Sequence, residues 1–224
     1  MIRRIAIAVA ALVFLGLLGF FLLSWRAAIA PIARPNPASF SAESVARGEV
    51  LAAEGHCLSC HIRPGGQPFA GGYGVNMPFG IIYGSNITPD PKTGVGAWPL
   101  EAFTRATREG VSRDGSHLFA AFPFNAYTEL RDDDVKALYA YLMSRPAVSA
   151  PVPPMTVLFP LNVGFLQEGW KLLRFKSGRY WLNHRPLGYK PTGNRNYNNL
   201  QDAGGPRKTL QEASRNRYWT TRGH

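Results

Sequence analysis

The sequence predicts an all-α fold, in which a small helical domain lies between an apolar N-terminal helix and an extended C-terminal arm. Three observations support this prediction. Ile5 to Leu23 is a run of nineteen residues without a charge. Apolar residues recur at helical spacing near residues 45–51 and 135–142. Residues 165–224 are rich in Arg, Lys, Asn and aromatic residues. We therefore expect an anchor and stalk at residues 1–34, a helical domain at 35–150 and a basic, aromatic-rich extension at 151–224.

The N-terminal run is long enough to cross a bilayer. Nineteen residues reach about 29 Å as a helix, close to the ~30 Å hydrocarbon thickness. Arg3 and Arg4 favour a cytoplasmic N-terminus, which would place everything from Arg34 onward outside the cytoplasm. The alternative is a cleaved signal peptide, because Ala28-Ile29-Ala30 resembles a cleavage site. Pro31 directly after that site disfavours cleavage, so we expect a retained single-pass anchor.

The stretch from Ala30 to Asn36 contains Pro31 and Pro35, and Pro37 follows. Proline interrupts a helix because it lacks a backbone N–H and its ring clashes with the preceding turn. We expect this stretch to be a stiff stalk that lifts the domain off the membrane.

The next feature is Cys57-Leu58-Ser59-Cys60-His61, because Cys-x-x-Cys-His is the attachment signature of c-type haem. Cys57 and Cys60 would bind the haem through its vinyl groups, and His61 would be one axial ligand of the iron. The alternatives are a redox dithiol and half of a zinc site. A dithiol of the thioredoxin kind needs a preceding strand, and a zinc site needs more ligands than the chain's two cysteines supply. We expect one covalently attached haem c.

Helices are predicted on both sides of this motif. Ser41 is a suitable cap for a helix that ends near Glu54, and after His61 the glycine-rich chain to about Tyr83 is expected to be a loop. Pro99 fits the first position of a short helix that Gly110 ends. A longer helix should begin at the acidic run 132–134 and stop before Pro146.

The formal charge is uneven along the chain. Residues 1–34 carry +4, residues 35–164 carry −2 and residues 165–224 carry +9, which sum to the net +11. The motif-bearing segment is slightly acidic and no nucleic-acid-binding signature is present, so the high isoelectric point does not indicate a nucleic-acid partner. The basic ends are more typical of contacts with a membrane or a protein partner.

A longer pattern supports the haem assignment. It comprises Asn86-Ile87-Thr88-Pro89-Asp90, Thr93-Gly94-Val95-Gly96, Phe103-x-Arg105-Ala106-x-Arg108-Glu109-Gly110 and Asp134-Val135-x-Ala137-Leu138-Tyr139. This pattern, over residues 44–150, resembles the first haem domain of multi-haem cytochrome c subunits of periplasmic alcohol, aldehyde and gluconate-type dehydrogenases and some molybdenum hydroxylases. The resemblance implies a cytochrome c-like domain around one haem. No second Cys-x-x-Cys-His follows, so this chain resembles a one-haem version.

The predicted function is electron transfer without enzyme activity. We expect a membrane-tethered monohaem cytochrome c, on the periplasmic side of a bacterial inner membrane, that passes single electrons between a membrane-associated redox complex and the electron-transport chain. One alternative is a haem sensor or haem enzyme with an open iron position. Another is an assembly subunit of a membrane redox complex.

The second axial ligand separates these hypotheses. Many members of the resembling family carry a methionine in an Ala-Met-Pro-Tyr segment, where this chain has Ala121-Phe122-Pro123-Phe124. The remaining candidates are Met77, Met143, Met155 and His117. We expect Met143 to pack in the core and His117 to be solvent-exposed, and we favour Met77, which lies in the glycine-rich stretch after the haem motif.

The extension from Phe165 has only short apolar runs and is expected to bury little core. It is either a partly disordered tail or an arm that orders against a partner subunit or on the membrane. We favour the arm because so many aromatics are unusual in a solvating tail, namely Trp170, Phe175, Tyr180, Trp181, Tyr189, Tyr197, Tyr218 and Trp219.

Overall fold

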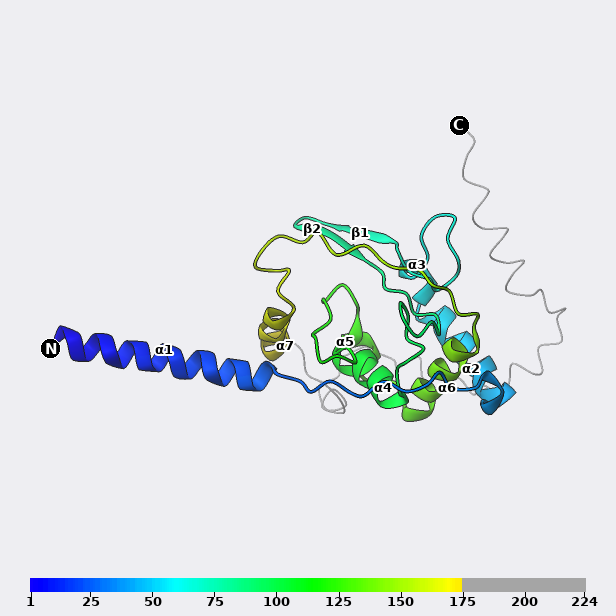
Figure 1. The fold of residues 1–224 in the computed structure, drawn as a ribbon, viewed down its shortest axis with the longest axis horizontal. Coiled ribbons are helices and arrows are strands. Elements are labelled where there is room, and N and C mark those ends of the chain that lie inside the picture. Colours follow the sequence, from blue (N-terminus) through cyan, green and yellow to red (C-terminus); the bar gives the residue numbers. More distant parts are fainter. Residues whose placement is uncertain (175–224) are drawn as a thin grey trace, which may run out of the picture. The chain divides into compact units, whose positions relative to one another are not determined.

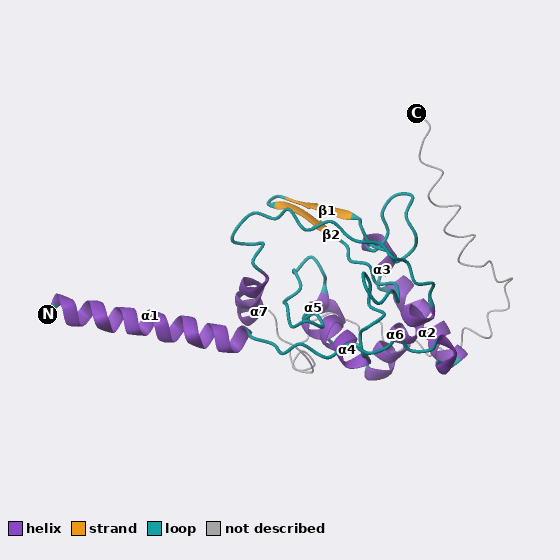
Figure 2. Cartoon of the chain, viewed as in Figure 1, coloured by secondary structure: helices purple, strands orange, loops and turns teal. Residues whose placement is uncertain are grey.

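The computed structural model describes residues 1–174 of the chain (Figures 1 and 2). Its elements are α1 (Ile2–Ser24), η1 (Pro37–Ser39), α2 (Ala42–Glu54), α3 (Cys57–Cys60), β1 (Gly74–Met77), β2 (Gly80–Tyr83), α4 (Leu100–Glu109), α5 (Phe124–Tyr127), α6 (Asp132–Ser144), η2 (Gly164–Leu166) and α7 (Gln167–Arg174). The described part is mostly helical, which confirms the predicted class.

Helix α1 contains the predicted apolar run. It has 23 residues, its most apolar window has a mean hydropathy of 2.8, and none of that window is buried. By length and composition α1 can cross a membrane, and a signal sequence meets the same criterion.

The core forms where α2 packs on α6 (Figure 1). The Ser41 side chain accepts a hydrogen bond from the backbone N–H of Ser44, so Ser41 is the predicted N-cap of α2. The two helices approach closely at Gly48, where a methyl group would overlap the carbonyl of Ala137. Eight consecutive or near-consecutive residues of α6 are buried, including Val135, Leu142 and Met143. The aliphatic and aromatic side chains of α6 therefore form the centre of the domain.

Helix α4 completes this core through Phe103, whose ring centroid lies 5.5 Å from that of Tyr139. Gly110 ends α4 in the left-handed conformation, with φ of 62°. This conformation favours glycine, as predicted. Pro99 is the N-cap of α4 rather than its first helical residue.

The predicted loop up to Tyr83 is wrong in part, because β1 and β2 form an antiparallel hairpin in it (Figure 2). The register pairs Val75 with Ile82 and Met77 with Gly80, so Pro78 and Phe79 form a two-residue turn. The apolar residues of β2 suit a strand. The many glycines nearby, which indicated a loop, instead serve close backbone approaches at its base.

The chain after α6 returns to the hairpin. The backbone N–H of Thr156 donates to the carbonyl of Ile81 at 3.0 Å, and that of Leu158 donates to the carbonyl of Phe79 at 3.0 Å. Gly80 has φ of 137°, and a side chain there would meet the Thr156 carbonyl. Residues 156–158 therefore cover the free edge of β2, which otherwise would expose unpaired backbone groups.

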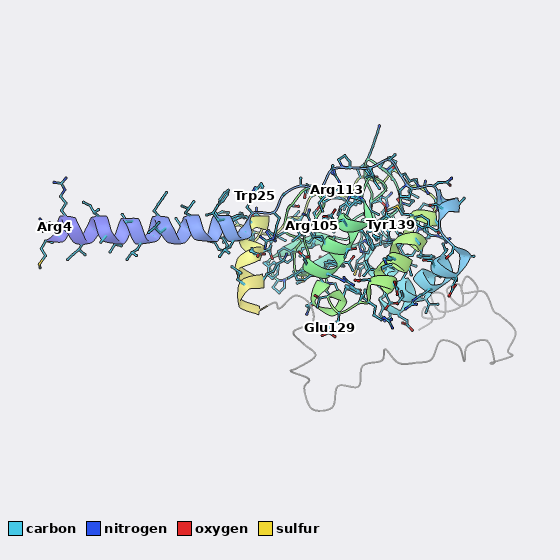
Figure 3. The ribbon with its side chains drawn as sticks, turned by 90° about the horizontal axis from the view of Figure 1, so that it is seen from below. Arg4, Trp25, Arg105, Arg113, Glu129 and Tyr139 are labelled. Atoms are coloured by element: carbon cyan, nitrogen blue, oxygen red, sulfur yellow. The ribbon has the colours of Figure 1, made fainter. Side chains whose placement is uncertain are left out.

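The stalk predicted at residues 30–36 is also wrong, because this segment lies along the domain instead of standing clear of it. The backbone N–H of Ile32 donates to the Ala97 carbonyl at 3.0 Å, and the Arg34 guanidinium donates to the carbonyls of Met143 and Arg145 at 2.9 Å each. The residues just before this segment also contact the domain. The backbone N–H of Ile29 donates to the Arg113 carbonyl at 2.8 Å, and the Arg113 guanidinium donates back to the Ile29 carbonyl at 3.0 Å. Arg105 donates to the Ala27 carbonyl at 2.7 Å. Arg105 and Arg113 are labelled in Figure 3. Proline stiffens this segment, while the arginines determine where it packs.

Candidate haem site

The cysteines of the motif lie on one short helical turn. Gly55 is the C-cap of helix α2, and its backbone N–H donates to the carbonyl of Leu51. His56 then adopts a left-handed conformation, with φ of 52°. This reversal starts α3, on which Cys57 and Cys60 are three residues apart. Cys57 is partly buried, Cys60 is exposed, and both carry free thiols. A single turn thus presents both sulfur atoms.

His61 follows directly and is fixed in orientation. Its Nδ1 lies 2.6 Å from the carbonyl oxygen of Ser85, which can only accept a hydrogen bond. Nδ1 therefore carries the proton, and the lone pair is on Nε2. Burial lowers the pKa of His61, and the Ser85 carbonyl opposes this effect. The imidazole is thus held neutral with Nε2 ready to coordinate a metal ion, the arrangement that a second polar group gives to metal-binding histidines.

The site depends on close backbone contacts around the motif. The backbone N–H of Gly71 donates to the His61 carbonyl at 2.9 Å. A side chain at Gly84 would overlap the Cys60 carbonyl, and one at Gly71 would meet the backbone of Ser85. Residues 84 and 85 therefore come against the motif only because glycine is present at these positions.

These residues fit a covalently attached haem. Burial raises the pKa of the Cys57 thiol to about 11, so the free thiol stays protonated at physiological pH. Two thiols on one turn, followed by an imidazole whose Nε2 is free among the described residues, are the donor set that the haem c motif requires. When bound, the haem would supply an iron centre that accepts and releases one electron.

The candidates for the second axial ligand lie in different environments. Met143 is fully buried in the core between α2 and α6, as predicted. Met77 ends β1 on the same face of the hairpin as Val75 and the buried Ile82. Met155, 44% exposed, precedes the residue that pairs with Ile81. The hairpin therefore brings Met77 and Met155 into one region, although they are far apart in the sequence.

The prediction that His117 is solvent-exposed is wrong. His117 is 7% exposed, with Nε2 2.7 Å from the Ser24 carbonyl and Nδ1 3.0 Å from the Lys171 ammonium. Burial lowers the pKa of His117, so the ring is neutral, donates from Nε2 and accepts at Nδ1. Both ring nitrogens are thus occupied. The flanking Gly115 suggested an exposed loop, but α7, which covers His117, has no pattern linking it to this position.

Sequence reasoning also missed Ser85. It acts through its backbone carbonyl, so its side chain carries no signal. The glycine that precedes it, Gly84, was the available clue, because a glycine after an apolar run can mark close backbone approach. The expected aromatic arm lies mostly outside the described residues: Phe175, Tyr180, Trp181, Tyr189, Tyr197, Tyr218 and Trp219 are not described, nor is the side chain of Trp170.

Comparisons with known proteins agree with this geometry. Residues 45–146 match the cytochrome c family. The chain is 47% identical over 158 residues to a subunit of nicotinate dehydrogenase from Pseudomonas putida, covering 70% of this chain and 13% of that protein. It is 40% identical over 153 residues to the fructose dehydrogenase cytochrome subunit of Gluconobacter japonicus, covering 67% of this chain and 32% of that protein. It is 50% identical over 99 residues to the gluconate 2-dehydrogenase cytochrome c subunit of Pantoea cypripedii, covering 44% and 22%.

The chain therefore spans less than a third of each of these three relatives. The names of the last two describe cytochrome subunits rather than catalytic subunits, in agreement with the prediction of an electron-transfer protein. The cytochrome c family, which residues 45–146 match, implies covalently bound haem c. The suspected resemblance to dehydrogenase cytochrome subunits is confirmed.

Proposed function

We propose that this chain is a membrane-tethered monohaem cytochrome c that carries single electrons between a membrane-associated dehydrogenase or other redox complex and the electron-transport chain. The observation that carries the proposal is His61, whose Nδ1 is held 2.6 Å from the Ser85 carbonyl beside the Cys57–Cys60 turn. In this proposal Cys57 and Cys60 hold one haem c and His61 is an axial ligand of the iron. The chain's two cysteines suffice for one such attachment.

The protein's part in electron transfer is to hold the haem and control its surroundings. The Ser85 carbonyl fixes the His61 ring and increases its basicity, which favours the oxidised iron. Leu58, which lies between the two cysteines, is 38% exposed, so its side of the turn lies at the surface. A haem attached here would have an edge near the surface, where a partner can exchange electrons with it. No side chain has to act as an acid, a base or a nucleophile.

The proposed location follows from α1 and the two basic residues in its first turn. The uncharged run from Ile5 to Leu23, with Arg3 and Arg4 at its N-terminal end, favours a single pass through the inner membrane with the haem domain on the periplasmic side. We also propose the domain boundaries given above: 1–34 for the anchor and the segment that follows it, 35–150 for the haem domain and 151–224 for the extension. The partner is a redox protein complex in or on the same membrane.

Reduction by the native partner tests this function. The full chain is purified with its complex after gentle solubilisation, and haem reduction is followed by absorbance after addition of the substrate of whichever dehydrogenase co-purifies. We expect reduction at the rate of substrate turnover in the wild type, no haem in Cys57→Ser/Cys60→Ser, and wild-type behaviour in the control Ser59→Ala. A haem that stays oxidised during turnover contradicts the proposal.

Met77 is our proposed second axial ligand, because it lies on the inward face of the hairpin. Met77→Leu conserves volume and removes the sulfur donor, and Met155→Leu is the matched control. We expect the reduced wild type to resist carbon monoxide and Met77→Leu to bind it. Uptake by Met155→Leu alone would assign Met155 instead. Ready uptake by the wild type would favour the sensor or enzyme hypothesis.

A further inference from the structure

Among the α7 side chains that the structure describes, the polar ones are buried and a leucine is exposed, which is the reverse of a helix that faces water. Glu168 and Lys171 are each 5% exposed, and Gln167 is 8% exposed, whereas Leu172 on the same helix is 54% exposed and Leu166 just before it is 43% exposed. A helix on the surface of a soluble domain buries leucine and exposes its charges. The opposite arrangement suits an element whose outer face contacts an apolar medium.

The buried polar groups of α7 fix it to the end of α1 and to α4. Glu168 Oε1 lies 3.1 Å from the guanidinium of Arg26. The Lys171 ammonium donates to the carbonyls of Glu109 at 2.8 Å and Gly110 at 2.7 Å, at the C-terminus of α4. His117 joins Lys171 to the Ser24 carbonyl. Figures 1 and 3 both show α7 beside the C-terminal end of α1, where Trp25 is labelled.

The turn before α7 exposes further apolar side chains. Leu158 is 67% exposed, Phe159 80% and Leu161 43%, and the chain carries no charged residue from Pro151 to Gln167. Backbone hydrogen bonds from Asn162 to Leu158 and from Val163 to Pro160 make this turn compact. By contrast, the whole of residues 26–150 contains only three exposed large apolar side chains, those of Ile32, Leu58 and Tyr73.

Aromatic contacts set the level of this region along α1. The ring centroid of Phe165 lies 5.1 Å from that of Phe20 and 5.6 Å from that of Phe21. Phe20 precedes the last residue of α1 by four positions, or about 6 Å at 1.5 Å per residue. Phe165 therefore lies at the level of the last turn of α1, where a membrane-spanning helix leaves the hydrocarbon.

We propose that Leu158, Phe159, Leu161, Leu166 and Leu172 form a membrane-docking surface that inserts into the periplasmic leaflet beside α1. This inference rests on the proposed membrane span. Continuity with α1 identifies lipid as the occupant, because a surface fixed at the level of the last turn of a spanning helix faces the interfacial region of the bilayer. The surface gives the domain a second contact with the membrane and fixes the direction in which the haem motif faces.

Site-directed spin labelling of the full, haem-loaded chain tests the proposal. Both native cysteines are used in haem attachment, so a single introduced cysteine is the only thiol. Labels are placed at Phe159→Cys, at Leu12→Cys within α1, and at the exposed Lys92→Cys as the matched control. The chain is reconstituted into phosphatidylethanolamine–phosphatidylglycerol vesicles, and label accessibility to apolar oxygen and to a water-soluble nickel chelate is compared.

We expect oxygen to be favoured over nickel at residues 12 and 159, and nickel to be favoured at residue 92. If residue 12 is in lipid but residue 159 is in water, the docking surface is wrong and the membrane span stands. If residue 12 is in water, the proposed span itself is wrong. Shielding of residue 159 from both reagents would show that protein, not lipid, covers the surface, and would also overturn the inference.

Discussion

The α2–α6 interface and the α7 region bury opposite kinds of side chain. At the first, Val135, Leu142 and Met143 are buried and the acidic first turn of α6 faces outward, where Asp134 pairs with Arg47. At the second, Glu168 and Lys171 are buried while Leu172 is exposed. The core of the domain is thus organised against water, and the region beside α1 is organised in the way expected against lipid. Four experiments test whether the two regions differ in this way.

The largest effect is expected from truncating leucines in the two regions. Leu142 is 2% exposed, so Leu142→Ala should lower the free energy of unfolding by about 2–5 kcal/mol through lost burial and a cavity. Leu172→Ala, at a side chain that is 54% exposed, should change it by less than about 0.5 kcal/mol in detergent. Urea unfolding of the solubilised chain measures both. Equal effects would show that α7 buries leucine after all.

A second pair compares glycines. Gly48→Ala should destabilise the domain by about 1–3 kcal/mol, because the methyl group would overlap the Ala137 carbonyl and force α2 away from α6. At Gly169 a methyl group would meet, among the described side chains, only the Phe20 ring, at 3.6 Å, and alanine favours a helix. Gly169→Ala should therefore stabilise α7 by about 0.5–1 kcal/mol. The midpoint of thermal unfolding for each variant is the measurement, and destabilisation by Gly169→Ala would refute the assigned packing on α1.

A third pair compares lysines. Lys171→Met leaves the Glu109 and Gly110 carbonyls without their charged donor, which should loosen α7 by about 1–3 kcal/mol. Lys136 is exposed and lies 3.6 Å from Asp133, so Lys136→Met should cost less than about 1 kcal/mol. Hydrogen exchange of the α7 amides reports the first variant directly. Unchanged protection in Lys171→Met would mean that α7 does not depend on this contact.

The smallest effect is a pH dependence confined to the α7 region. Burial lowers the pKa of His117, and it lowers that of Lys171 to about 8. The state in which α7 is released from the domain therefore binds more protons than the state in which α7 is packed on it. The packing of α7 should weaken as pH falls through 6.5, the ordinary histidine pKa. It should strengthen as pH rises from about 8 to 10.5.

Hydrogen exchange of α7 at pH 5.5 and 7.5, corrected for intrinsic rates, measures the acid limb of this dependence. His117→Gln, which keeps a neutral donor and acceptor, should flatten it. Protection that increases on acidification would show that His117 is protonated and paired with Glu168, whose Oε2 lies 3.1 Å from Nδ1.

Several features follow from local sequence, because their causes lie within a few residues. Ser41 caps α2, Gly110 ends α4 and Pro146 stops α6 before it can continue. The position of each depends on backbone geometry at that residue and its neighbours. The same is true of the Cys57–Cys60 turn, whose spacing alone suggested the cofactor that the matching family implies.

Other features were settled only by contacts between distant segments. The role of Ser85 could not be predicted from the sequence, because its backbone carbonyl, not its side chain, orients His61. The glycines near the hairpin suggested a loop, since sequence does not show that Gly71 and Gly84 are needed for close backbone approach. The proline-rich segment suggested a stalk, because nothing in it reveals the distant carbonyls of Ala97, Met143 and Arg145 that accept its hydrogen bonds.

Helices α2, α4 and α6, the haem motif and the apolar run of α1 could be predicted from the sequence, because periodicity, spacing and hydropathy are local properties. Only the tertiary structure shows that His117 and Lys171 are buried and that Phe159 and Leu172 are exposed. The physical reason is that burial of a side chain depends on what packs over it. Here the covering groups come from α1, α4 and α7, which are separated by up to 142 residues between Arg26 and Glu168.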